Sequence, residues 1–128
     1  MNRVNRIFFG GLIGWLAGFS FGTAVLPFVL VILLPDTPVE VYTMMRQWAL
    51  PATVLWIAPG AYAAYRGGAG QGGRIFAMGG LVVGALYGLL IAAASGAWPV
   101  IMVSAITAAL YGWGAGLLVG AGFGTAEA

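Results

Sequence analysis

Residues 75–97 read IFAMGGLVVGALYGLLIAAASGA and contain no charged side chain. At ~1.5 Å of rise per residue, a helix of this length reaches about 35 Å. That is enough to cross the hydrocarbon core of a bilayer, which is about 30 Å thick. Three further apolar stretches cover residues 7–34, 48–65 and 100–123. The sequence therefore predicts an all-α membrane protein, with four transmembrane helices in a single polytopic domain over residues 1–128.

The composition of the chain agrees with a membrane setting. Apolar residues make up 62% of it and charged residues 6%, whereas soluble proteins carry roughly 25% charged residues. So few charges cannot cover the surface of a water-soluble domain. We expect an integral membrane protein surrounded by the lipid bilayer, in the inner membrane of a bacterium.

The connector over residues 35–47 is polar and holds a helix-start signal. Thr37, Pro38 and Glu40 fit a capping box, with Thr37 as N-cap and Glu40 at the third helical position. A helix is therefore expected to begin near Pro38. It either lies on the membrane surface or runs into the helix at 48–65, and we favour the second arrangement with a kink at Pro51.

The other connectors and the first span carry their own signals. Residues 66–74 are rich in glycine and predict a flexible loop. The link between the helices at 75–97 and 100–123 is so short that these two helices must form an antiparallel hairpin. The first stretch is longer than a span requires, so we expect Pro27 to kink it or a tilt to absorb the excess.

The arginines set the orientation of the chain. Cytoplasmic loops of membrane proteins carry an excess of Lys and Arg. One side of the predicted topology holds four arginines, Arg3, Arg6, Arg66 and Arg74. The other side holds one arginine, Arg46, together with the acids Asp36 and Glu40. We expect the first side, with both termini, to be cytoplasmic.

The chain also repeats part of itself. Residues 6–13 (RIFFGGLI) align with residues 74–82 (RIFAMGGLV) when one residue is inserted. Both copies enter the membrane from the same side, which suggests a two-helix unit duplicated in parallel orientation. The second and fourth helices align poorly, so chance similarity among glycine-rich helices is the alternative.

Glycines recur every fourth residue in three of the four spans, in the pattern of a glycine zipper. Such rows let helix backbones approach closely in lipid, where there is little hydrophobic drive for helices to meet. The rows are Gly10, Gly14, Gly18 and Gly22; Gly80, Gly84 and Gly88; and Gly112, Gly116, Gly120 and Gly124. The alternative is that membrane helices simply tolerate glycine.

The glycine rows alone do not identify their partner, which is the same chain, a second copy or another protein. Three rows in a four-helix chain suggest that some of them face outward. We therefore expect a homo-oligomer or membership of a larger membrane complex.

Several function classes are disfavoured by what the sequence lacks. No span carries a charged side chain near its centre, which argues against a proton-coupled pump. The chain has no Cys and no His, which removes thiolate chemistry and the usual zinc ligands. We expect no enzyme, no metal and no cofactor. The arginines are scattered and form no basic stripe, so no nucleic-acid partner is expected.

The intramembrane aromatics are the remaining candidates for a ligand or a pathway. Tyr87, Tyr111 and Trp113 lie beside the glycine rows. The alternative for them is packing, with each hydroxyl bonded to a nearby carbonyl. The leading hypothesis is a non-enzymatic structural or accessory subunit. A small channel or facilitator and a binder of lipid or of a lipid-soluble cofactor are the alternatives.

Overall fold

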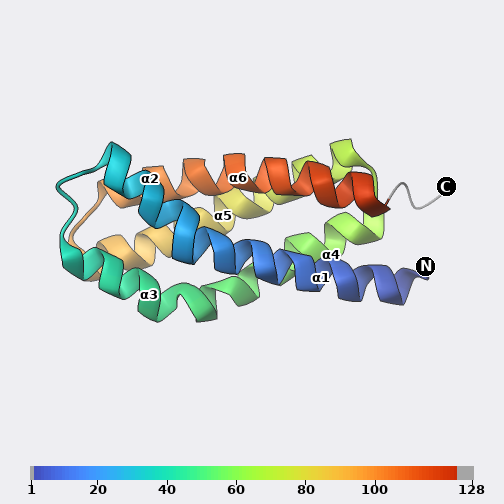
Figure 1. The fold of residues 1–128 in the computed structure, drawn as a ribbon, viewed down its shortest axis with the longest axis horizontal. Helices are drawn as coiled ribbons and strands as arrows, with labels where there is room; N and C mark the ends of the chain where they lie inside the picture. Colours follow the sequence, from blue (N-terminus) through green and yellow to red (C-terminus); the bar gives the residue numbers. More distant parts are fainter. Residues whose placement is uncertain (1, 124–128) are drawn as a thin grey trace.

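The computed structural model describes residues 2–123, which form helices and short connections between helices. Gly124 and Glu127 lie outside the described residues. Four helical arms run lengthwise beside one another (Figure 1). The first arm is continuous and consists of α1 (Arg3–Ser20), the π-helical turn η1 (Phe21–Val25) and α2 (Leu26–Leu33). The third and fourth arms are single helices, α5 (Ala69–Ser95) and α6 (Pro99–Phe123).

Three of these helical arms are long and apolar enough to cross a membrane. They are Arg3–Leu33, Ala69–Ser95 and Pro99–Gly122. Each is at least as long as the roughly 20 residues that a span requires. The chain is therefore an all-helical integral membrane protein.

The second arm is broken into three pieces. They are α3 (Val39–Thr53), the 3₁₀ turn η2 (Val54–Trp56) and α4 (Ile57–Arg66). Pro51 lies inside α3, and a proline removes one helical N–H and crowds the preceding turn. The helix tightens into the 3₁₀ turn just after it. Helix α3 is continuous from Val39 to Thr53, so the helix that begins after Pro38 continues into residues 48–53 without a loop.

The predicted capping box is wrong. Pro38 is the N-cap of α3, and no side chain caps this helix end. The Thr37 hydroxyl instead donates a hydrogen bond to the Leu34 carbonyl at 2.6 Å. Leu34 is the C-cap of α2, where carbonyls lack helical donors. Thr37 therefore closes the preceding helix and does not open the next one.

The prediction of a flexible loop over residues 66–74 is also wrong for most of that range. Helix α5 begins at Ala69, so the connection is Gly67 and Gly68, both with positive φ. The Gly68 N–H donates to the Gly120 carbonyl of α6 at 3.0 Å, and Gly72 is buried. Packing against α6 outweighs the low helix propensity that glycine shows in water.

The arms form two helical hairpins. Helix α1 packs against α4, and α5 packs against α6. Both hairpins begin at the end of the molecule that carries the N-terminus and the α4–α5 connection (Figure 1). We call it the basic end, because its arginines are Arg3, Arg6, Arg66 and Arg74.

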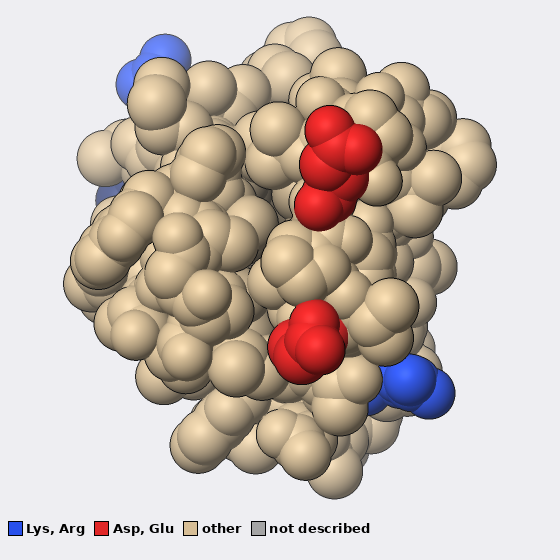
Figure 2. Space-filling view, turned by 90° about the vertical axis from the view of Figure 1, so that its left-hand side faces the viewer, with Lys and Arg blue, Asp and Glu red and all other residues tan. Residues whose placement is uncertain are grey.

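The opposite end, here called the acidic end, carries the α2–α3 and α5–α6 connections. Figure 2 views the molecule from this end and shows its acidic side chains on an otherwise largely uncharged surface. Asp36 and Glu40 are both exposed. The charges of the described residues thus lie towards the two ends of the bundle, as expected when the middle lies in hydrocarbon.

Candidate functional site

The candidate site lies where the two helix breaks, η1 and η2, meet the other hairpin. Four rings from four different elements come together there: Phe21 of η1, Trp56 of η2, Phe76 of α5 and Tyr111 of α6. The Trp56 ring centroid lies 5.6 Å from that of Phe21, 6.4 Å from Phe76 and 6.3 Å from Tyr111. The Phe21 and Tyr111 centroids are 5.9 Å apart. These separations are typical of attractive aromatic pairs, and we call this group the aromatic cluster.

Proline explains the helix break that holds Phe21. Pro27 has no N–H, and its ring clashes with the carbonyl of residue 23 in a regular helix. The chain widens into a π turn just before it, in which the Leu26 N–H donates to the Phe21 carbonyl. Single π turns in membrane and soluble helices often occur at functional sites. The π turn before Pro27 therefore lies beside the aromatic cluster.

A glycine on a neighbouring helix makes room for Trp56. A Cβ atom added to Gly18 of α1 would lie 2.5 Å from Cγ of the indole, which no real Cβ tolerates. Gly112 of α6 lies on the other side of the indole, where an added Cβ would make an ordinary van der Waals contact with Cζ3 at 3.6 Å. Trp56 is 1% exposed. Its indole therefore lies between the first hairpin and the second, and joins them.

Other glycines allow backbone to meet backbone within each hairpin. A Cβ on Gly60 of α4 would lie 2.7 Å from Gly14 Cα of α1. In the second hairpin, a Cβ on Gly116 would lie 2.6 Å from the Gly72 carbonyl carbon. All ten described glycines of the three predicted rows are buried by helices of this same chain: Gly10, Gly14, Gly18, Gly22, Gly80, Gly84, Gly88, Gly112, Gly116 and Gly120.

Side-chain hydroxyls inside the bundle bond to backbone carbonyls. The Tyr87 hydroxyl donates to the Met45 carbonyl of α3 at 2.8 Å, and the Ser104 hydroxyl donates to the Gly84 carbonyl of α5 at 2.7 Å. Both bonds join different helices. Within the described part of the chain, no buried side-chain nitrogen or oxygen lacks a hydrogen-bond partner. These polar groups therefore act as links between helices.

The three aromatics predicted to face a ligand or pathway do not share a site. Tyr87 is buried and bonded to α3. Tyr111 belongs to the aromatic cluster, and Trp113 is 53% exposed on the outer surface. The sequence indicated Trp56 as one of the aromatics inside the spans, but it did not single out Phe21 or Phe76. The one available signal was that Trp56 stands between two prolines, Pro51 and Pro59, which mark a broken helix.

The chemistry open to the aromatic cluster is limited to packing and weak polar contacts. Its only polar atoms are the Tyr111 hydroxyl and the Trp56 indole nitrogen. Among residues 2–123, no group of three His, Cys, Asp or Glu side chains could hold a metal ion. The cluster is suited to joining the hairpins and has no group for acid–base work at neutral pH.

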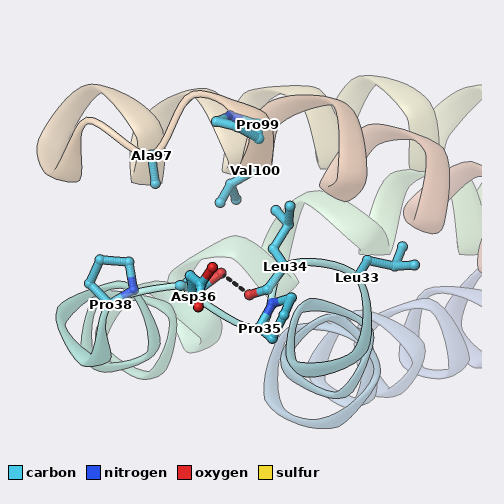
Figure 3. Close-up of a pocket in the computed structure, with 9 residues that line it drawn as sticks. Leu33, Leu34, Pro35, Asp36, Pro38, Ala97, Pro99 and Val100 are labelled. Carbon is cyan, nitrogen blue, oxygen red and sulfur yellow. Dashed lines mark hydrogen bonds between the residues drawn. The ribbon is translucent and has the colours of Figure 1, made fainter.

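A second hollow lies at the acidic end, between the α2–α3 connection and the start of α6. Figure 3 shows Leu34, Pro35 and Asp36 on one side of it and Ala97, Pro99 and Val100 on the other. Its volume is about 370 Å³. The lining is mostly apolar, and Asp36 supplies one exposed carboxylate. A single exposed carboxylate is too few ligands for a metal and forms no catalytic pair.

Comparison of the chain with protein-family models, with curated proteins and with solved structures gave no match.

Proposed function

We propose that this chain is a non-enzymatic structural or accessory subunit of a membrane assembly. The observation that carries the proposal is the interlocked centre of the bundle. Trp56 occupies the space left by Gly18, and the rings of the aromatic cluster pack together beside both helix breaks. A bundle closed in this way contributes shape and an outer surface.

The proposal includes four membrane crossings, with the second arm as the fourth span. Residues 39–66 reach about 42 Å at ~1.5 Å per residue, more than the ~30 Å of the hydrocarbon core. This arm runs beside the first arm from the acidic end to the basic end (Figure 1). The arginine bias then favours a cytoplasmic basic end.

Close glycine contacts would supply much of the cohesion of the bundle. Lipid offers little hydrophobic drive for association, so dispersion between near backbones takes its place. The contacts of Gly60 with Gly14 and of Gly116 with Gly72 support this, because neither pair leaves room for a methyl group.

A partner would meet the outer surface and not the glycine rows. Those rows are covered by the chain itself, so they do not favour an oligomer, contrary to the reasoning from the sequence. The outer face of α1 instead presents large apolar side chains, including Phe8, which is 65% exposed, and Leu16, which is 50% exposed. We propose that a second copy or the helices of a larger complex pack against such faces.

The test is isolation of the tagged chain from its native membrane in a mild detergent, followed by cross-linking and native mass spectrometry. A discrete oligomer or a stoichiometric co-purifying protein is the expected result. The matched variants are Phe8→Ala, on the outer face, and Thr43→Ala, an exposed site on α3. Phe8→Ala should reduce the assembled fraction and Thr43→Ala should not. A monomer without partners at every detergent concentration contradicts the proposal.

A small channel or facilitator is the second candidate, and one observation favours it. The helix breaks η1 and η2 lie near the middle of their arms and face each other across the Phe21–Trp56 contact. Discontinuous helices recur at the substrate sites of transporters. Purified protein in liposomes should then carry ions or small solutes, and Trp56→Ala should change the flux. No flux above that of protein-free liposomes, across a broad solute panel, would exclude this candidate.

A further inference from the structure

A groove follows the outer side of the first hairpin, between α1 and α4. It consists of two adjoining hollows of about 480 Å³ and 370 Å³, both lined by Ile7 and Ala61. Gly11 and Ala58 contribute to its lining without a long side chain. We call it the α1–α4 groove. Its lining is almost wholly apolar, and it faces the region that lipid tails occupy.

The length of the groove matches one leaflet of a bilayer. It extends from Tyr65 at the basic end to Trp15 and Ile57 nearer the middle of the arms. From Arg3 to Trp15 along α1, the rise is about 18 Å at ~1.5 Å per residue. Half of the hydrocarbon core is about 15 Å. An acyl chain of one leaflet therefore fits along the groove from its mouth to its inner end.

A cation stands at the mouth of the groove. The Arg3 guanidinium lies 5.3 Å from the centroid of the Tyr65 ring, and its Nη1 donates to the Tyr65 hydroxyl at 3.5 Å. Tyr65 lines the groove and stacks on Tyr62, with ring centroids 6.4 Å apart. Arg3 is exposed, so a ligand outside the bundle can reach it. A guanidinium with a neighbouring hydroxyl is well suited to a phosphate.

The charges nearby favour a ligand with a net negative charge. Arg66, the last residue of α4, is exposed at the same end. Arg6 is buried behind the mouth, where its Nε donates to the Ala64 carbonyl at 2.9 Å. The described acids, Asp36 and Glu40, lie at the opposite end. Basic pockets between membrane helices recognise the headgroups of anionic lipids.

We propose that the α1–α4 groove binds one anionic phospholipid, with its phosphate at Arg3 and Tyr65 and one acyl chain along Gly11 towards Trp15. An apolar cofactor would use the groove but not the cation at its mouth, and a soluble anion would use the cation but not the groove. A phospholipid uses both. Phe8, which the proposed function places on the partner-facing surface of α1, also lines this groove. The lipid binding itself needs no partner protein, so it is measured on the isolated chain.

The test is native mass spectrometry of the full chain in detergent, with phosphatidylglycerol and phosphatidylcholine of identical acyl chains added in equal amounts. The wild type should retain one phosphatidylglycerol in preference to phosphatidylcholine. Arg3→Gln should lower that preference about five-fold, because one arginine near a headgroup contributes about 1 kcal/mol. Arg46→Gln removes the same charge from α3, away from the groove, and should leave the preference unchanged.

A second pair of variants tests the acyl-chain part of the groove. Ala58→Leu places a larger side chain in the groove and should reduce the retention of both lipids. Ala94→Leu makes the same change at an exposed site on α5 and should have no effect. Equal retention of the two lipids by the wild type would overturn the proposal, as would an Arg3→Gln result equal to that of Arg46→Gln. Since Arg3 is exposed, its replacement leaves the fold intact and the first comparison stands even if Ala58→Leu misfolds.

Discussion

Replacing Gly116 by alanine should weaken the α5–α6 hairpin, whereas the same change two residues earlier should not. A Cβ on Gly116 would lie 2.6 Å from the Gly72 carbonyl carbon and 2.7 Å from Phe76 Cβ. A Cβ on Gly114 would meet nothing within 4 Å. Both glycines belong to α6, so the pair of variants separates the effect of close packing from the effect of helix propensity.

The size of the difference follows from the contact distances. Carbon atoms in contact prefer about 3.5–4.0 Å, so the two helices must separate by about 1 Å to accept the Gly116→Ala methyl. Each pair of atoms in contact gains about 0.1–0.2 kcal/mol of dispersion attraction, and a gap of this size removes up to half of it. Over the several tens of pairs at a helix crossing, the loss is about 2 kcal/mol. Alanine recovers at most about 1 kcal/mol of this through its higher helix propensity.

Gly116→Ala should therefore lower the free energy of unfolding by about 1 kcal/mol, combining the two terms. Gly114→Ala gains only the propensity term, so it should be neutral or stabilising by up to about 1 kcal/mol. The assay is equilibrium unfolding of the purified protein by sodium dodecyl sulfate in mixed micelles, followed by circular dichroism. If Gly116→Ala proves as well tolerated as Gly114→Ala, the backbone contact between α5 and α6 does not stabilise this hairpin.

Three further predictions use the same unfolding assay. Trp56→Ala should destabilise the fold by about 3–5 kcal/mol through the cavity it leaves. Replacement of the exposed Trp113 by alanine should cost much less. Equal losses would show that Trp56 does not join the hairpins. Tyr87→Phe should cost about 0.6 kcal/mol, the average for hydrogen bonds between membrane helices, and at most about 1.7 kcal/mol. An unchanged midpoint would mean that the bond to the Met45 carbonyl contributes nothing. Ser104→Ala should cost a similar amount, because it removes the bond to the Gly84 carbonyl, and a stabilised variant would contradict this.

The class of the protein could be predicted from the sequence because it depends on local properties. Apolar runs of sufficient length define membrane helices whatever they pack against. The structure confirms an all-helical chain, with helices at Arg3–Leu33, Ala69–Ser95 and Pro99–Gly122 that could cross a membrane. The four-residue spacing of glycines was equally visible, but spacing alone does not name the opposing surface.

The elements that were mispredicted depend on contacts between distant residues. Gly72 is helical because Gly116 and Gly120 lie against it, and nothing within residues 66–74 shows this. The hydroxyl of Thr37 could accept a hydrogen bond from an N–H of the next helix or donate one to a carbonyl of the preceding helix. It donates to the Leu34 carbonyl. Local patterns favour the capping box, but the Leu34 carbonyl at the end of α2 accepts from both the N–H and the hydroxyl of Thr37.

The aromatic cluster was missed for the same reason. The position of Trp56 depends on a 3₁₀ turn in its own arm, on the missing side chain of Gly18 in α1 and on contact with Tyr111 in α6. These three residues are far apart in the sequence. Their juxtaposition requires the topology of both hairpins, which the sequence suggested only through an imperfect repeat.

Three features of the account require the second arm to cross the membrane. They are the first hairpin as a membrane unit, the contact of Gly14 with Gly60 inside the bilayer and the α1–α4 groove. The chain has no cysteine, so single-cysteine variants can report the two sides of the membrane. In intact cells, a membrane-impermeant thiol reagent should label Asp36→Cys, at the acidic end, and should reach Arg66→Cys only after the membrane is permeabilised. Labelling of both variants from the same side would show that residues 39–66 do not cross.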